Sequence, residues 1–199
     1  AGSIRPSITL IVHDIKDTNK LISAGQYFFT DIKKEGIILY DSNRFALAKA
    51  RRLSLNERKK FAVEDFNSWF KEAKDFFIAY KTMFEKKKYK NAAFQLHQTA
   101  ERFYQTVLLV STHYKPKIHD LLSLGKQVAR EDPCFKKIFP QKTAEERRRF
   151  KLLKEAYTRA RYDKEYRITR ADLEYLAERV NKLQRLTKKF CDAKIKSFG

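Results

Sequence analysis

Cysteine and glycine are both scarce in this sequence, and each scarcity excludes a class of protein. The 199 residues include two cysteines, Cys134 and Cys191, which are too few for a disulfide framework and fit a reducing compartment. Only five glycines are present, and none belongs to a glycine-rich phosphate-binding loop. The histidines and cysteines also lack the spacing of metal ligands, so we expect no metal site.

Long hydrophobic runs are missing as well. The longest, residues 8–12 and 107–110, are far shorter than the roughly 20 apolar residues that span a membrane. The first residues lead directly into a strand-like run and do not have the pattern of a secretory signal. These features predict a soluble, cytoplasmic protein without a membrane partner.

Positive charge is abundant and unevenly placed. The formal net charge is +20, and residues 1–45 carry six basic and five acidic side chains, which leaves 38 basic and 19 acidic ones in 46–199. A domain this basic attracts polyanions, and nucleic acid is the usual candidate. The alternative is that the lysine-rich helix faces are only solvated surface. Apolar residues make up 43% of the chain, so a folded core is expected.

The first 45 residues contain four short elements by pattern. We expect a strand at 8–12, helices at 14–24 and 27–35, and a second strand at 37–40. Gly25 and Gly36 are placed to end the two helices. Two strands and two helices cannot close a sheet core alone, so this segment is predicted to be the tail of a larger α/β domain.

The pattern changes to helical periodicity from Ser54 onward. Apolar residues recur every three or four positions, which is typical of amphipathic helices. Five helices are expected, which begin after Ser54, at Tyr89, at Pro116, after Thr143 and after Thr169. The fourth is expected to continue past Tyr157 to Ala160. Because the links are mostly short, residues 46–199 are predicted to form an antiparallel up-and-down helix bundle, and the fold class is mainly α.

Several segments of this bundle occur in the order of a known family. A tryptophan-bearing helix around Trp69 precedes a tyrosine-led helix that starts at Tyr89. A His119-Asp120-Leu121 triplet follows, and then Tyr157-Thr-Arg159-Ala-Arg161-Tyr162. This ordered set, within residues 54–195, resembles a HEPN domain of the minimal type. The resemblance implies a homodimer with a nucleotide or nucleic acid as its partner.

The first 45 residues carry a second resemblance. Residues 8–14, 25–29 and 32–41 are similar to the end of a nucleotidyltransferase domain of the kanamycin nucleotidyltransferase type, which bacteria often fuse before a HEPN domain. That family needs a Gly-Ser turn followed by two carboxylates one residue apart, which hold metal ions. Gly2-Ser3 is followed by no such pair. The resemblance implies a remnant without the catalytic half, so Mg²⁺ and a nucleoside triphosphate are expected only with an upstream transferase half.

None of the histidines has the spacing that ribonucleases of the HEPN type require. Many HEPN domains resemble metal-independent RNases in which four to six residues separate an arginine from a following histidine that acts as acid or base. No histidine here has an arginine at that spacing, and Arg161 is followed by Tyr162 and Asp163. We therefore expect no catalytic residue, and predict a non-catalytic module that dimerises and helps an associated nucleotidyltransferase domain to bind a nucleotide or nucleic acid.

Two alternatives remain open. One is a HEPN-type ribonuclease that uses Arg161 and His119 from facing helices, and the other is a toxin–antitoxin component.

Arg161 with Tyr162 is the first choice for binding a nucleotide phosphate, because a guanidinium fork suits phosphate oxygens. Alternatively, Arg161 bonds helix carbonyls or pairs with Glu101. Arg159 is also a candidate, but it lies about 200° around the helix from Arg161, so both cannot hold one phosphate.

His119, Gln98 and Glu101 complete the candidate set. His119 stands at a helix start, where either a ligand role or a structural contact to a neighbouring helix is expected. His97 with Glu101, and Gln98 with Arg102, are spaced as local pairs. Alternatively, Gln98 and Glu101 face the Arg161 helix and form a polar pocket or a dimer contact. The basic runs at 86–88 and 147–149 are further polyanion candidates, although contiguous charge spreads around a helix.

Overall fold

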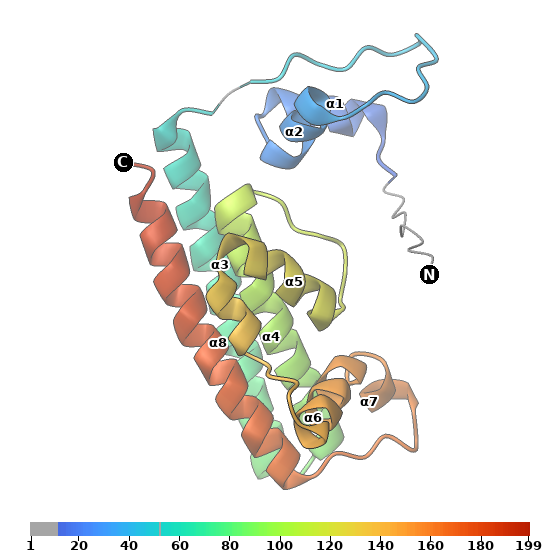
Figure 1. Cartoon of the computed structure of the whole chain (residues 1–199), viewed down its shortest axis with the longest axis vertical. Coiled ribbons are helices and arrows are strands. Elements are labelled where there is room, and N and C mark those ends of the chain that lie inside the picture. Colours follow the sequence, from blue (N-terminus) through green and yellow to red (C-terminus); the bar gives the residue numbers. More distant parts are fainter. Residues whose placement is uncertain (1–11, 52) are drawn as a thin grey trace. The chain divides into compact units, whose positions relative to one another are not determined.

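The computed structural model describes residues 12–51 and 53–199, and the chain divides into two compact units (Figure 1). The units comprise residues 1–53 and 54–199, so the division falls after Leu53. Each unit is considered by itself.

The first unit contains the two predicted helices. Helix α1 (Ile15–Ser23) begins after Asp14, whose carboxylate accepts hydrogen bonds from the next backbone N–H groups, and α2 (Tyr27–Glu35) ends before Gly36. Gly25 has φ +74°, and a Cβ atom there would lie 2.8 Å from a side-chain carbon of Leu53. Both the backbone angle and the close packing therefore require glycine at the turn between the helices.

The predicted strand at 37–40 is wrong. These residues form an exposed loop, in which the side chains of Ile37, Leu39 and Tyr40 are 85–94% exposed. A strand needs a neighbouring strand to pair its backbone and a surface to cover its apolar side chains, and the described residues of this unit offer no strand. The other predicted strand lies outside the described residues except for Val12, which is exposed and not in a strand.

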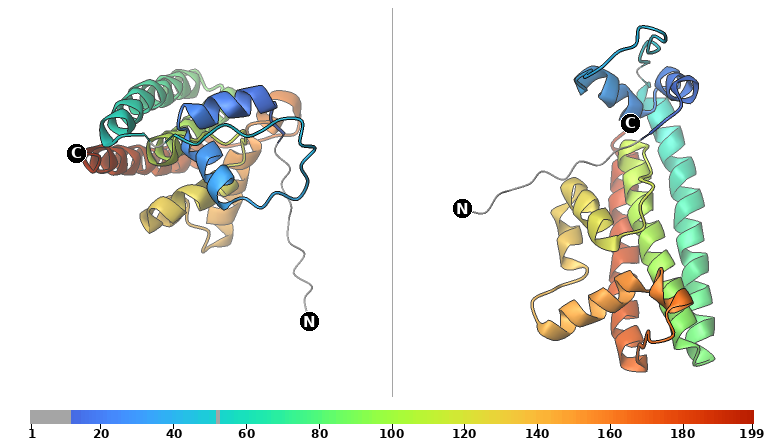
Figure 2. Two further views of the ribbon diagram at one scale, coloured as in Figure 1. Left: turned by 90° about the horizontal axis from the view of Figure 1, so that it is seen from above. Right: turned by 90° about the vertical axis from the view of Figure 1, so that its right-hand side faces the viewer.

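The second unit is a mainly α bundle, as predicted. It contains α3 (Leu55–Glu85), α4 (Tyr89–Thr112), α5 (Leu121–Glu131), a 3₁₀ turn η1 (Pro133–Lys137), α6 (Ala144–Glu155), α7 (Arg159–Tyr162) and α8 (Arg170–Lys196). The long helices α3, α4 and α8 lie side by side, and the shorter helices pack on one side of them (Figures 1 and 2).

The directions of the long helices follow from contacts at their ends. Lys59 near the start of α3 contacts the backbone oxygen of Gly199, just beyond α8. At the other end, the Tyr80 hydroxyl of α3 donates to the backbone oxygen of Leu173 in α8. Helix α3 is therefore antiparallel to α8, and the short link at 86–88 makes it antiparallel to α4. Helices α4 and α8 therefore run in the same direction, and the segment that contains α5–α7 connects the end of α4 to the start of α8 (Figure 1).

Side-chain caps set three of the helix starts as expected. Ser54, Thr143 and Thr169 each accept a hydrogen bond from a backbone N–H in the first turn and receive the reciprocal carboxylate, which makes a capping box. Each such cap stabilises a helix by roughly 1 kcal/mol. Capping therefore explains why the sequence places these boundaries well.

Two predicted boundaries are wrong. The third helix begins at Leu121 and not at Pro116, because the Asp120 carboxylate caps it by accepting from the backbone N–H of Ser123 at 2.8 Å. The fourth helix does not continue to Ala160 but ends at Glu155, and a turn separates it from α7. This break redirects the chain just before Arg159.

Helix α4 lies at the centre of the bundle. It contacts α3, α5, α6, α7 and α8, and its buried residues include the ionisable side chains of His97 and Glu101. Buried charge is rare unless it is paired, so this segment of α4 marks a polar site in the core. No helix within the described ranges is long and apolar enough to cross a membrane.

Candidate functional site

Glu101 and His119 form the centre of the candidate site. Nδ1 of His119 lies 3.1 Å from both carboxylate oxygens of Glu101. The Glu101 side chain is fully buried, whereas that of His119 is 49% exposed. Helix α4 thus holds the carboxylate inside the bundle, and the loop before α5 places the imidazole between that carboxylate and solvent.

His97 contacts the same carboxylate from one turn earlier on α4. Its Nδ1–H donates to the backbone oxygen of Leu153 on α6 at 3.0 Å, and its Nε2 lies 3.4 Å from Oε2 of Glu101. The second contact does not have the geometry of a hydrogen bond. The predicted His97–Glu101 pair is present within α4, and the bond from His97 to Leu153 joins α4 to α6.

Two further donors reach Glu101 from its own helix. Arg102 donates to Oε1 at 3.1 Å, and the side-chain amide of Gln105 donates to the same oxygen at 3.2 Å. Burial alone raises the pKa of Glu101, but the neighbouring imidazoles of His97 and His119 outweigh it and hold that pKa below its usual value. Glu101 is therefore ionised at neutral pH.

An ionised carboxylate only accepts hydrogen bonds, so Nδ1 of His119 must carry the hydrogen. Nε2 of His119 then makes no hydrogen bond to any described residue. The buried carboxylate thus orients the imidazole and leaves its second nitrogen accessible to another molecule. Such an imidazole commonly binds a ligand or transfers a proton.

Tyr157 connects His119 to Arg161. The rings of His119 and Tyr157 stack with centroids 4.3 Å apart and planes 15° apart. The guanidinium carbon of Arg161 lies 4.9 Å from the centroids of Tyr157 and Phe94, and 5.0 Å from that of Tyr162. We name His119, Glu101, Tyr157, Arg161 and Tyr162 the His119–Arg161 site.

The two arginines of α7 have different surroundings. Arg159 forms ion pairs with Glu155 and Asp163, each at 2.7 Å, which neutralise its charge locally. Arg161 donates through Nε to the backbone oxygen of Tyr157 at 2.8 Å and pairs with no carboxylate in the described part of the chain. Of the expected alternatives for Arg161, the carbonyl bond is present and the pair with Glu101 is not.

Two of the candidate residues, Tyr162 and Gln98, differ in exposure and in their contacts with the site. Tyr162 is 76% exposed beside Arg161, so one face of its ring is accessible to a ligand. Gln98 is buried, and its side-chain oxygen has no hydrogen-bond partner among residues 12–51 and 53–199. The predicted Gln98–Arg102 pair is wrong, because Arg102 bonds Glu101, Gln105 and Glu72. No hydrogen bond joins Gln98 to the His119–Arg161 site in the described residues.

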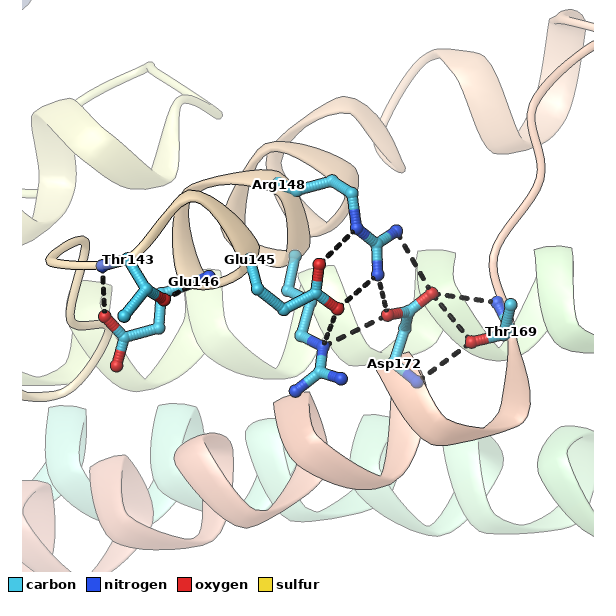
Figure 3. Close-up of polar contacts among 7 residues, drawn as sticks. Thr143, Glu145, Glu146, Arg148, Thr169 and Asp172 are labelled. Carbon is cyan, nitrogen blue, oxygen red and sulfur yellow. Dashed lines mark hydrogen bonds and ion pairs between the residues drawn. The ribbon is translucent and has the colours of Figure 1, made fainter.

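The three arginines at 147–149 form hydrogen bonds and ion pairs within the protein. Arg148 bonds both Glu145 and the buried carboxylate of Asp172, and Thr169 bonds Asp172 as well (Figure 3). Arg149 lies 3.2 Å from the same carboxylate, while Arg147 donates to the backbone oxygens of residues 141 and 142. This run therefore ties α6 to the start of α8 and is a poor polyanion site.

The lysines at 86–88 are different. They are exposed at the link between α3 and α4, and they form no ion pair with the described residues. In the first turn of α4, Lys90 donates to the backbone oxygens of Asp163 and Lys164, just after α7. The unpaired lysines and Arg161 therefore lie at the same end of the bundle.

Sequence reasoning missed the roles of Tyr157 and Phe94. Tyr157 was assigned to an apolar stripe and Phe94 was given no role, whereas in the structure their rings flank the Arg161 guanidinium. For Tyr157 a sequence signal was present, because it lies four positions before Arg161, whereas the contact with Phe94 of α4 has no local signal. No group of three or more His, Cys, Asp or Glu side chains that could hold a metal ion occurs in the described ranges.

Comparison with known families yields one match. The model of the HEPN domain matches residues 66–190, which is more than half of the chain and extends from α3 into α8. The matched range includes every residue of the His119–Arg161 site. A comparison with curated proteins found no match.

Proposed function

Because this chain belongs to the HEPN domain family, we propose that its bundle is a binding module that holds a nucleotide or nucleic acid at the His119–Arg161 site. The observation that supports the proposal most directly is the environment of the Arg161 side chain. Its guanidinium has no carboxylate partner among the described residues, and three aromatic rings hold it near the exposed imidazole of His119.

Each part of the site suits a component of a nucleotide. The free edge of the Arg161 guanidinium suits phosphate oxygens, and the exposed ring of Tyr162 suits stacking by a base. Nε2 of His119 suits a third contact to phosphate or sugar. The unpaired lysines at 86–88, at the same end of the bundle, would add attraction for further phosphates if the ligand is a polynucleotide.

A titration with a fluorescent single-stranded RNA tests the proposal. Anisotropy is measured for the unmodified chain, for Arg161→Gln and for Arg159→Gln, at two salt concentrations. Each substitution removes one positive charge, and the two positions are only two residues apart. Arg159 has carboxylate partners, whereas Arg161 has none among the described residues. We expect Arg161→Gln to weaken binding by roughly tenfold, since a charged hydrogen bond contributes about 1.5 kcal/mol or more.

Arg159→Gln should change the affinity much less. Equal losses for the two variants would mean that only net charge matters, and this would refute the site. The same titration with a labelled ATP analogue separates a mononucleotide ligand from a polynucleotide.

We also propose that the module dimerises and serves an associated nucleotidyltransferase domain, as the first 45 residues suggested. Mg²⁺ and a nucleoside triphosphate would bind to that domain. Light scattering at micromolar concentration tests dimerisation, and a monomer there would remove that part of the proposal.

A second candidate function is metal-independent RNA cleavage, which the Glu101–His119 geometry favours. In that reaction Nε2 of His119 would accept the proton of a ribose 2′-hydroxyl, which attacks the adjacent phosphorus. The P–O5′ bond would break to give a 2′,3′-cyclic phosphate and a 5′-oxygen, which would become a hydroxyl by taking a proton back from Nε2 of His119 or from water. The Arg161 guanidinium would stabilise the negative charge on the phosphate.

RNA incubation followed by end-group analysis decides this candidate. Cyclic phosphate ends that disappear in His119→Ala and Arg161→Ala would support it. Cleavage that persists unchanged in both variants would identify a contaminating nuclease. Growth arrest on expression in bacteria would favour the toxin–antitoxin alternative.

A further inference from the structure

A separate pocket lies between α4, α5, η1 and α6. Its volume is about 270 Å³, and its wall is mainly apolar. The apolar wall includes Leu121, Leu122, Ala129, Phe135, Phe139 and Phe150. Pockets with apolar walls and a few polar groups are the usual form of small-molecule sites. None of the residues of the His119–Arg161 site lines it.

Tyr104 of α4 brings a hydroxyl to this pocket. The residue is only 2% exposed, and its hydroxyl has no hydrogen-bond partner in the described residues. The other deeply buried tyrosines differ, because Tyr80 donates to the backbone oxygen of Leu173 and Tyr166 to that of Leu152. A hydroxyl that lines a pocket and bonds no described residue can bond a molecule there, so the Tyr104 hydroxyl is available to a ligand.

Gly125 keeps this hydroxyl accessible. A Cβ atom on Gly125 would lie 3.3 Å from the Tyr104 hydroxyl oxygen, which is tighter than an ordinary contact. Glycine within a helix lowers its stability by about 1 kcal/mol relative to alanine. Gly125 therefore leaves open space beside Tyr104, although it makes α5 less stable than an alanine would.

Two lysines give the pocket a positive charge. Lys126 and Lys136 line it, are exposed, and form no ion pair within the described residues. Elsewhere lysines are paired, as Lys182 is with Glu178 at 2.6 Å and Lys188 with Asp192 at 2.6 Å. Unpaired ammonium groups beside an apolar cavity attract an anion that carries an apolar group.

We propose that this pocket, which we name the Tyr104 pocket, binds a small amphipathic carboxylate such as a medium-chain fatty acid. The apolar tail lies among the phenylalanine and leucine side chains. The carboxylate accepts hydrogen bonds from the Tyr104 hydroxyl and from the Lys126 ammonium. A cavity of about 150 Å³ holds benzene, so this pocket accommodates a ligand of roughly ten carbon atoms.

Titration calorimetry of the full chain with decanoate, below its micelle concentration and at neutral pH, tests the proposal. We expect saturable binding of one decanoate per chain. Butyrate should bind much more weakly because each buried methylene contributes about 0.8 kcal/mol, a factor of roughly four. Decanol has the tail without the charge, so it should also bind more weakly.

Three variants assign the binding to the pocket. Tyr104→Phe removes only the hydroxyl, and Lys126→Gln removes one ammonium, so each should weaken decanoate binding by roughly tenfold. Lys71→Gln is the matched control, since it removes the same charge from an exposed position on α3 and should leave the affinity unchanged. Circular dichroism and the melting temperature confirm that each variant is folded.

The proposal is overturned if decanoate shows no saturable binding. It is also overturned if Tyr104→Phe and Lys126→Gln bind decanoate as the unmodified chain does. Equal binding of decanol and decanoate would overturn the carboxylate as the recognised group. A change from dimer to monomer in the pocket variants, without decanoate binding, would instead identify this surface as a contact between two copies of the chain.

Discussion

Nδ1 of His119 donates to both carboxylate oxygens of Glu101 at 3.1 Å, across 18 positions of the chain. This contact joins the loop before α5 to the middle of α4. It orients an exposed imidazole by means of a fully buried carboxylate. The same carboxylate accepts from Arg102 and Gln105, so one side chain organises donors from two segments.

Replacement of Glu101 by glutamine should destabilise the bundle. The variant keeps one acceptor oxygen but removes the negative charge that faces Arg102 and His119, and it places an NH₂ donor against one of them. Loss of one partner from a buried ionic group lowers the unfolding free energy by about 3 kcal/mol. Urea denaturation measures this loss. Glu178→Gln, which removes a carboxylate from an exposed pair on α8, is the control and should leave the midpoint nearly unchanged.

The acid sensitivity of the fold should depend on buried carboxylates. The pKa of Asp172 is raised by burial but lowered more strongly by hydrogen bonds from Arg148 and Thr169, and the pKa of Glu101 is also below its usual value. A carboxyl group with a lowered folded-state pKa stabilises the protein above its unfolded pKa, and this stability is lost as pH falls through the folded pKa. Unfolding free energy should therefore be steady from pH 7 to 5 and decline below about pH 4.

Asp172→Asn provides the comparison. This variant should be less stable at neutral pH, and its unfolding free energy should fall less between pH 7 and pH 3 than that of the unmodified chain. Parallel curves for the two proteins would show that Asp172 does not contribute to the acid transition.

Loss of the cap at α8 should matter more than loss of the cap at α6. Thr169→Ala removes a hydrogen bond to the buried Asp172 carboxylate as well as the cap, so we expect a loss of about 2 kcal/mol. Thr143→Ala affects a capping box at an exposed helix start and should lower stability by about 1 kcal/mol. Thermal unfolding followed by circular dichroism compares them, and equal shifts would argue against the role of the Asp172 network.

The Tyr157 ring should be needed for nucleotide binding, whereas its hydroxyl should not. Tyr157→Phe keeps the stacking against His119 and Arg161, so RNA affinity should change little. Tyr157→Leu removes the aromatic face that holds the guanidinium, and affinity should fall by roughly fivefold because such a contact contributes about 1 kcal/mol. Similar anisotropy curves for the two variants would contradict this role.

Local patterns in the sequence predicted the helices with good accuracy. The capping boxes at Ser54, Thr143 and Thr169 correspond to observed helix starts, because a cap depends on residues only three positions apart. The predictions failed where a capping residue was present nearby, or where a predicted strand had no other strand to pair with. Asp120 caps the third helix in place of a start at Pro116, and residues 37–40 have no described strand to pair with.

The sequence by itself determined the bundle, the capped helix starts and the family resemblance, since these depend on periodicity and on the order of short motifs. It also identified Arg161, His119 and Glu101 as candidates. Only the tertiary structure decided that Arg159 is neutralised, that Arg161 is not, and that the Tyr104 hydroxyl faces a pocket without a partner. The physical reason is that charge pairing and burial depend on which side chains from distant segments meet, and packing alone sets those contacts.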